Sequence, residues 1–384
     1  VRIKEGQIGL SSLHIETGLS SIFADQFAFC FERWKDFRRF AEEVQFDVRI
    51  DSSKVSLKDL SYFVHDLKGM NDSFELKGNF ADVLQDMKIA DLDLRFGENS
   101  FVQGDFLLPF FTDTTGKYFK QYLSKAHINL SDLDAIKMPE GILPIDLDAS
   151  LKKNDFLSIS NMEINGSEDN FDFKFDTVKT ALGELFLPTS MNFNRNNDKI
   201  KIKLNDDEAN NLLIRELHLN ELFNENKFGK ISGNLKPELE FSDSGELLSI
   251  QLHSSILSMN VNGYQVTNIQ IEEGHLFEDV LKAGLRVSDE NVKLDLSCEI
   301  DLGQKQSYDA KINIQRLNLD ELNLTSDSSS IESSSIVIHC LNPKQNQFEG
   351  IFSTDSILYR QGTKVVPVTD ASMFVTINEN KEHY

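Results

Sequence analysis

Carboxylates, histidines and cysteines could perform chemistry in this sequence, but none of them has the spacing of a catalytic or metal site. Asp91 with Asp93, and Asp146 with Asp148, are close pairs that share a strand face. Two carboxylates in one cleft can divide acid and base roles when their surroundings differ. Here Asp and Glu occur along the whole chain, which is typical of solvated strand faces. We therefore interpret both pairs as surface residues.

The eight histidines and three cysteines show no metal-ligand spacing. Cys30, Cys298 and Cys340 are far apart, and no His-x-x-x-His or His-Glu-x-x-His pattern occurs. His127 and His218 precede similar segments, but their alternating neighbours favour solvent-facing strand positions. Calcium loops, nucleophile elbows and phosphate-binding glycine loops are also missing from the sequence. We expect no cofactor, no metal and no enzymatic activity, and cysteines that act as small apolar residues. A glycan-active enzyme is the weakest alternative.

The composition excludes several classes of function. The 384 residues include 39 Lys and Arg and 62 Asp and Glu, for a formal net charge of −23 at pH 7. This charge argues against nucleic-acid binding and against attachment to anionic lipid by charge alone. The longest apolar run, at 106–111, contains Pro109 and is far shorter than the ~18 residues that span a membrane.

Phenylalanine is abundant, with 29 Phe against 7 Tyr and 1 Trp, although the mean hydropathy is −0.31. Because Phe has no polar group, this indicates that apolar and charged residues are sorted onto opposite faces. Alternation with a period of two shows such sorting at 73–80, 171–176, 200–204 and 291–301. Strands that are apolar on one side only favour an antiparallel sheet with one wet face.

Signals for helices and boundaries are few. The spacing predicts one short amphipathic helix over 58–70 and allows another near 34–43. A serine-rich loop at 326–330 suggests a weak boundary near 326–335. Alternating strands that run into Leu-x-x-Leu recur too irregularly for a solenoid and fit a meander. We therefore treat 1–384 as one repetitive segment of about 25 to 35 strands.

A sheet of that many strands must curl or close, and a curled sheet with its apolar side inward forms a trough. An open trough would hold acyl chains, because burying about 14 methylenes at roughly 0.8 kcal/mol each gives about 11 kcal/mol. A trough filled by its own side chains would instead be a β-sandwich or solenoid, suited to an adhesin or envelope scaffold. Periodicity does not separate these two alternatives.

Between Trp34 and Phe106 the sequence resembles the TamB translocation and assembly module family, which belongs to the AsmA-like group of diderm envelope proteins. The matching segments are Trp34–Phe37, Val55–Phe63, Leu67–Asn71, Phe74–Phe80 and Gly104–Phe106. Beyond this stretch the chain shares with the family only a general pattern of alternating strands and Leu-x-x-Leu breaks.

The resemblance implies a mainly β fold: an elongated, curled antiparallel sheet, called a β-taco, with one or two short helices and a U-shaped apolar groove. It also implies a periplasmic, non-enzymatic protein that conducts phospholipid between the inner and outer membranes and supports outer-membrane biogenesis. The implied partners are phospholipid acyl chains, the inner membrane through an N-terminal helix, and an outer-membrane barrel of the TamA type. Because the sequence lacks that helix and is short for the family, we expect it to be part of a longer chain.

The resemblance implies only on which face of a strand a side chain lies, and it implies no catalytic residues. It places three residues of one matching strand in the groove, and alternation extends this role to six more. The expected groove lining is Phe74, Leu76, Phe80, Phe171, Phe173, Phe175, Val292, Leu294 and Leu296. A second alternative keeps the trough but uses an exposed edge to chaperone outer-membrane strands by β-augmentation.

Overall fold

The computed structural model divides the chain into two compact units, and we describe each separately. It describes residues 2–62, 72–108, 118–135, 156–167, 169–196, 199–205, 211–223, 228–242, 245, 247–277, 279–301, 303, 307–344, 347–378 and 381–383. The first unit comprises Val1–Ala181 and Phe186–Asn194, and the second comprises Leu182–Leu185 and Arg195–Tyr384. Strand β11 (Gly183–Asn196) thus contributes residues to both units. The weak boundary expected near 326–335 falls inside the second unit, at the start of β20.

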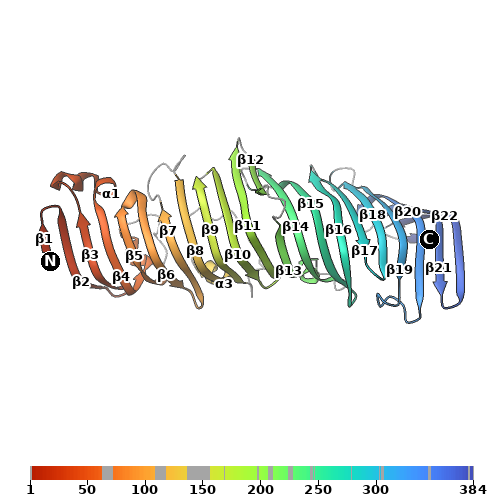
Figure 1. Cartoon of the computed structure of the whole chain (residues 1–384), viewed down its shortest axis with the longest axis horizontal. Helices are drawn as coiled ribbons and strands as arrows, with labels where there is room; N and C mark the ends of the chain where they lie inside the picture. Colours follow the sequence, from red (N-terminus) through yellow and green to blue (C-terminus); the bar gives the residue numbers. More distant parts are fainter. Residues whose placement is uncertain are drawn as a thin grey trace. The chain divides into compact units, whose positions relative to one another are not determined.

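The first unit is an antiparallel meander in which each strand pairs with the next one along the chain (Figure 1). Its alternating sequence gives strands with one apolar and one polar side. The strands are β1 (Arg2–Lys4), β2 (Gln7–Glu16), β3 (Ser21–Cys30), β4 (Gln45–Ser56), β5 (Ser73–Val83), β6 (Met87–Phe96), β7 (Ser100–Leu108), β8 (Tyr118–Asn129), β9 (Phe156–Ser167) and β10 (Asn170–Thr180).

The second unit follows the same plan. Strands β12 and β13 both pair with β14, and every later strand pairs with its successor. The strands are β12 (Lys199–Leu204), β13 (Leu212–His218), β14 (Phe228–Ser242), β15 (Leu247–Val261), β16 (Tyr264–Phe277), β17 (Val280–Ser288), β18 (Val292–Asp301), β19 (Ser307–Asn318), β20 (Ser329–Lys344), β21 (Gln347–Gln361), β22 (Lys364–Asn378) and β23 (Lys381–His383).

The helices of the described residues are short, with three to six residues each, and lie between strands. They are η1 (Trp34–Arg39), α1 (Phe40–Glu43), α2 (Leu57–Leu60), η3 (Leu84–Asp86), α3 (Leu130–Ala135) and α5 (Leu219–Phe223). The helix expected near 34–43 is present as η1 and α1. The one expected over 58–70 is described only at α2, and residues 63–71 lie outside the described part. There are more short helices than the one or two expected, because helices of three to six residues are too short to leave a clear period of 3.6 in the sequence.

A line of β-bulges crosses the first unit. Register shifts occur in each strand pair from β3–β4 to β7–β8, at positions that are close to one another on the ladder. Two of these bulges hold a polar residue in the left-handed region, Ser52 with φ 35° and Asp91 with φ 54°. A bulge bends its strand and increases its twist, so a continuous line of bulges curls this sheet. The mainly β, curled antiparallel fold expected from the sequence is confirmed.

The bulges also keep the apolar side chains on one face. In β6 the apolar positions are odd-numbered before Asp91, as at Ile89, and even-numbered after it, as at Leu94. Opposite residues on a ladder share a face, and these two lie opposite Phe106 and Val102 of β7. The bulge therefore absorbs one residue, and the alternation resumes on the same side of the sheet.

We predict that Asn161→Val destabilises the first unit by about 2 kcal/mol and that Asn161→Gly has a smaller effect. Asn161 has φ 49°, a conformation that a β-branched residue adopts at a cost of about 1–2 kcal/mol. Its side chain also accepts a hydrogen bond from Tyr122 and donates one to Asp176. Trp34 is the sole tryptophan and lies in this unit, so its fluorescence during urea unfolding gives the measurement. Equal stabilities of the two variants would contradict the role of the left-handed backbone.

Candidate functional site

The apolar face of the first unit is built from rows of side chains that run across the strands. One row joins Val48, Phe80, Ile89 and Phe106 from β4, β5, β6 and β7. A neighbouring row joins Leu76, Leu94, Val102, Ala126 and Ile159 from β5 to β9. The first row ends at Phe106, which lies opposite Gln121 of β8, and the second begins at Leu76, which lies opposite Ser53 of β4. Both rows cross β5 to β7, so the apolar surface continues from one row to the other.

The three groove residues expected on β5 all lie on this apolar face. Phe74 is opposite Val55 and Phe96 on the ladder. Leu76 and Phe80 belong to the two rows described above, and all three side chains are half-buried. The structure therefore brings these residues together on one side of the sheet; Phe74 and Phe80 have apolar ladder partners on both sides, and Leu76 lies between Ser53 and Leu94.

The groove residues expected on β10 form the far end of the same face. The Phe171 ring stacks on Phe193 of β11, with a centroid distance of 4.4 Å, and lies 6.2 Å from Phe173. Phe119 of β8 is also 5.8 Å from Phe171. Phe175 is 9% exposed, whereas Phe171 and Phe173 are half-buried. The first two rings are therefore more accessible than Phe175.

On β18 of the second unit, the expected residues divide into a covered part and an open part. Val292 is buried in a cluster with Leu322, which comes from the turn between β19 and β20. Leu294 packs against that cluster, and Leu296 is half-buried between Leu285 and Ile312. The chain itself thus fills the face at Val292 and leaves it accessible toward Leu296.

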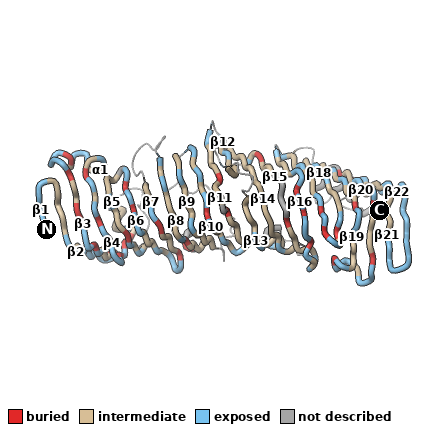
Figure 2. The backbone as a smooth tube through the Cα atoms, viewed as in Figure 1, coloured by how far each residue is buried: buried red, intermediate tan, exposed pale blue. Residues whose placement is uncertain are grey.

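Neither unit has a core packed with large rings. Among the described phenylalanines, only Phe31 and Phe175 are nine-tenths buried. Among the residues whose burial is described, Leu187 and Val44 are the only large apolar side chains below 2% exposure. Figure 2 shows intermediate burial along most strands, with buried positions scattered between them. Side chains that are covered only by neighbours in their own sheet leave an apolar surface available for a ligand.

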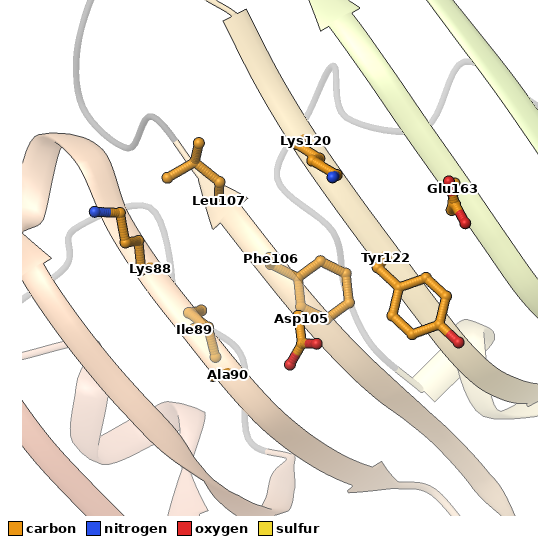
Figure 3. Close-up of a pocket in the computed structure, with 9 residues that line it drawn as sticks. All are labelled: Lys88, Ile89, Ala90, Asp105, Phe106, Leu107, Lys120, Tyr122 and Glu163. Atoms are coloured by element: carbon orange, nitrogen blue, oxygen red, sulfur yellow. The ribbon is translucent and has the colours of Figure 1, made fainter.

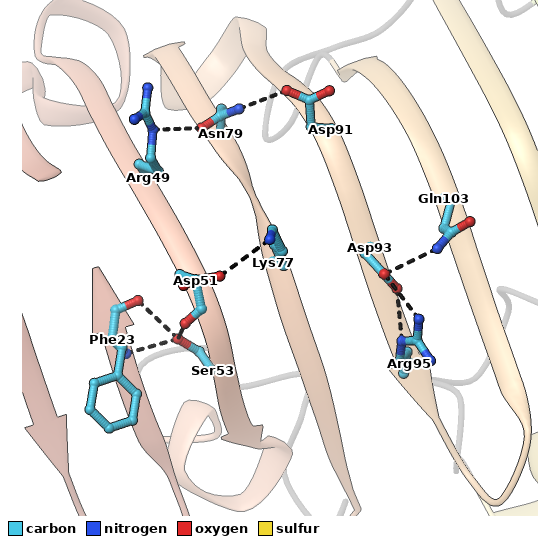
Figure 4. A network of polar contacts seen from close by, with 10 residues as sticks. All are labelled: Phe23, Arg49, Asp51, Ser53, Lys77, Asn79, Asp91, Asp93, Arg95 and Gln103. Carbon is cyan, nitrogen blue, oxygen red and sulfur yellow. Dashed lines mark hydrogen bonds and ion pairs between the residues drawn. The ribbon is translucent and has the colours of Figure 1, made fainter. Parts of the chain in front are cut away.

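The opposite face of the first unit carries polar ladders between neighbouring strands (Figure 4). Between β4 and β5, Lys77 Nζ lies 3.4 Å from Asp51 Oδ1. Within β6, Arg95 Nε lies 3.0 Å from Oδ1 of Asp93, which also accepts a hydrogen bond from Gln103 of β7 through its second oxygen. Burial raises the pKa of Asp93, but hydrogen bonds from Arg95 and Gln103 outweigh it, so the pKa is lowered overall. Exposed pairs of this kind contribute about 0–1 kcal/mol each. Their main effect is to keep this face hydrated. Asp91 and Asp93 lie on this polar face.

A hollow of about 500 Å³ also lies on this charged face (Figure 3). Lys88, Asp105 and Tyr122 line it, and each has a partner. Lys88 pairs with Asp82, the Asp105 carboxylate accepts the Asp91 amide, and the Tyr122 hydroxyl donates to Asn161. Ile89 and Phe106 of the apolar row also contribute to the lining of this hollow, so it adjoins the apolar face, and the three polar side chains named here already have partners.

Buried carboxylates at the strand ends were not singled out by the sequence patterns. Asp132 of α3 accepts hydrogen bonds from the Glu98 and Asn99 amides and the Ser100 hydroxyl. Burial acts to raise the pKa of Asp132, and these hydrogen bonds outweigh it and lower the pKa. In the second unit, Asp289 is similarly buried and bound by hydrogen bonds. Their partners are distant in sequence, so no local pattern marks such sites, and we interpret them as structural.

The remaining candidate residues do not assemble into a reactive site. No group of three His, Cys, Asp or Glu within the described ranges could hold a metal ion. His127 lies between aromatic rings with Nδ1 2.6 Å from Ser158, and His218 pairs with Glu221. The three cysteines are unpaired. Asp146 and Asp148 lie outside the described residues. The apolar faces are therefore the candidate functional sites.

Comparisons with known proteins leave the family open. No family model matches the chain, and no curated protein or solved structure is significantly similar to it. Among the described residues, no helix has the length and apolar character needed to span a membrane.

Proposed function

We propose that the protein binds phospholipid acyl chains on the apolar faces of its two units and conducts phospholipid between the inner and outer membranes. The observation that carries this proposal is a continuous apolar face whose phenylalanine rings remain half-buried. Such a face offers an acyl chain apolar contacts on successive strands, so a tail can slide along it. The charged opposite face keeps the chain soluble while lipid is bound.

The cellular setting of this proposal rests on the resemblance to the TamB family. It places the protein in the periplasm of a diderm bacterium, with an inner-membrane anchor in the full-length form and an outer-membrane barrel of the TamA type as partner. In that setting, delivery of phospholipid supports outer-membrane biogenesis. No covalent step is required, because movement along the face needs only a gradient of lipid.

A second candidate function, chaperoning outer-membrane strands, is favoured by the edge of β22. Among the described residues, only Thr376–Asn378 of this strand pair with β23, so the rest of that edge lacks a described partner. Val366, Met373 and Phe374 are exposed there on both sides of the strand. An unpaired, apolar edge can accept an added strand through main-chain hydrogen bonds. Crosslinking from β22 to nascent barrel proteins, but not from the apolar faces, would favour this function.

Native mass spectrometry tests the lipid proposal directly. We expect protein purified without detergent to carry phospholipid adducts, which chloroform extraction and lipid analysis identify. A structural scaffold with a filled interior would carry none. Protein that remains free of lipid after incubation with phospholipid vesicles would contradict the proposed function.

A further inference from the structure

The short helix η1 presents a ring and two cations on separate ridges. In a 3₁₀ helix, the side chains at i and i+3 lie above one another. Trp34 therefore stacks over Phe37, with ring centroids 6.0 Å apart, and is 64% exposed. Lys35 and Arg38 form a second, exposed ridge. The third ridge starts with Asp36, which is 4% exposed and turned toward the protein.

The rings beneath Trp34 lead to the apolar face of the first unit. Phe37 lies 6.4 Å from Phe29, and Phe29 lies 5.2 Å from Phe46. Phe29 and Phe46 are ladder partners on β3 and β4, and Ile3 of β1, 64% exposed, ends the same row. Trp34 thus forms the exposed end of a continuous aromatic path.

The cations beside Trp34 are available for an external anion. Arg39 is paired with Glu42 and Glu43, but neither Lys35 nor Arg38 has an ion pair among the described residues. The net charge of −23 would repel an anionic surface as a whole. At physiological ionic strength, however, charges beyond about 8 Å are largely screened. Arg33 pairs with Asp36, and Arg39 with the two glutamates of α1. A surface in contact with η1 therefore meets two cations, Lys35 and Arg38, and one exposed carboxylate, Glu32, that have no ion pair among the described residues.

We propose that η1 docks on the surface of a bilayer that contains anionic lipid. Trp34 would lie at the interface, where the amphipathic indole ring is favoured, and Lys35 and Arg38 would contact lipid phosphates. The aromatic path then connects the bilayer to the apolar face of the first unit. This docking goes beyond lipid binding in the groove and can be tested separately from it.

Vesicle binding tests the docking, since Trp34 is the sole tryptophan. With vesicles of 70% phosphatidylcholine and 30% phosphatidylglycerol, we expect co-sedimentation, a blue shift of Trp34 emission and quenching by brominated acyl chains. Lys35→Gln with Arg38→Gln should weaken binding about 25-fold, since about 1 kcal/mol for each cation is about fivefold. The matched control is Lys54→Gln with Lys120→Gln, two exposed lysines elsewhere in the unit. The control should bind like the unmodified protein.

Three results would overturn the docking: no blue shift with anionic vesicles, equal binding to pure phosphatidylcholine vesicles, or equal weakening by the control. Lipid adducts measured by native mass spectrometry on the same preparations separate this inference from the proposed function. Adducts without vesicle docking would overturn the docking alone. Docking without adducts would overturn the groove alone.

Discussion

Leu296→Glu is expected to remove most bound phospholipid from the protein, whereas Ser297→Glu leaves it in place. The two residues are neighbours on β18 but lie on opposite faces, with Leu296 between Leu285 and Ile312. A carboxylate in the acyl path must be desolvated by every passing tail, at a cost of several kcal/mol. We therefore expect at least about a tenfold loss of lipid adducts from Leu296→Glu, measured by native mass spectrometry.

The Ser297→Glu variant makes this comparison sharp, because it adds the same charge to the same strand. Circular dichroism and thermal unfolding establish that both variants are folded. In the first unit, Phe173→Glu should act like Leu296→Glu, since Phe173 is half-buried beside Phe171. Val292→Glu provides a further contrast: Val292 is buried by the chain's own side chains, so this change should destabilise the second unit as well. Lipid adducts that persist in both Leu296→Glu and Phe173→Glu would contradict conduction along the apolar faces.

Much of the fold could be predicted because a half-buried strand has a strict physical period. Residues 291–301 alternate without interruption, and β18 pairs with β17 from Lys293 to Asp301 without a register shift. The antiparallel pairing also follows from sequence, since strands with one wet face are seldom found in parallel sheets. The faces assigned to Phe74, Leu76 and Phe80 agree with the ladder for the same reason.

What alternation could not predict are features that depend on contacts between distant residues. At the Asp91 bulge, the apolar residues of β6 change from odd-numbered to even-numbered positions. In the sequence alone, this break in the alternation looks like the end of a strand. The covering of Val292 depends on Leu322, which approaches only when the turn after β19 folds back. Trp34 is part of the resemblance, but its exposure depends on how η1 packs through Phe37 on Phe29 and Phe31. Sequence patterns thus predict on which face of the sheet a side chain lies, and the structure shows which parts of that face other side chains cover.

Asp132→Asn is expected to destabilise the first unit by about 2–3 kcal/mol at pH 7, the second large effect. Asp132 is 7% exposed, and its carboxylate holds the turn at Gly97 through the amides of Glu98 and Asn99 and the Ser100 hydroxyl, the last at 2.6 Å. Hydrogen bonds to a charged group contribute about 1.5–3 kcal/mol. An amide has one acceptor atom instead of two, so part of this set is lost. Urea unfolding followed by Trp34 fluorescence measures the change.

The pH dependence gives this prediction its second test. Because the pKa of Asp132 is lower in the folded protein than in the unfolded chain, where it is about 3.9, its contribution is present above that value. The contribution is lost as the pH falls through the folded pKa. The difference between Asp132→Asn and the unmodified protein should therefore shrink below about pH 4. Asp105→Asn, an exposed aspartate that accepts one amide hydrogen bond, is the matched control and should change stability by less than about 1 kcal/mol. A difference for Asp132→Asn that stays constant from pH 7 to pH 3 would show that the charge of Asp132 is not what holds the turn.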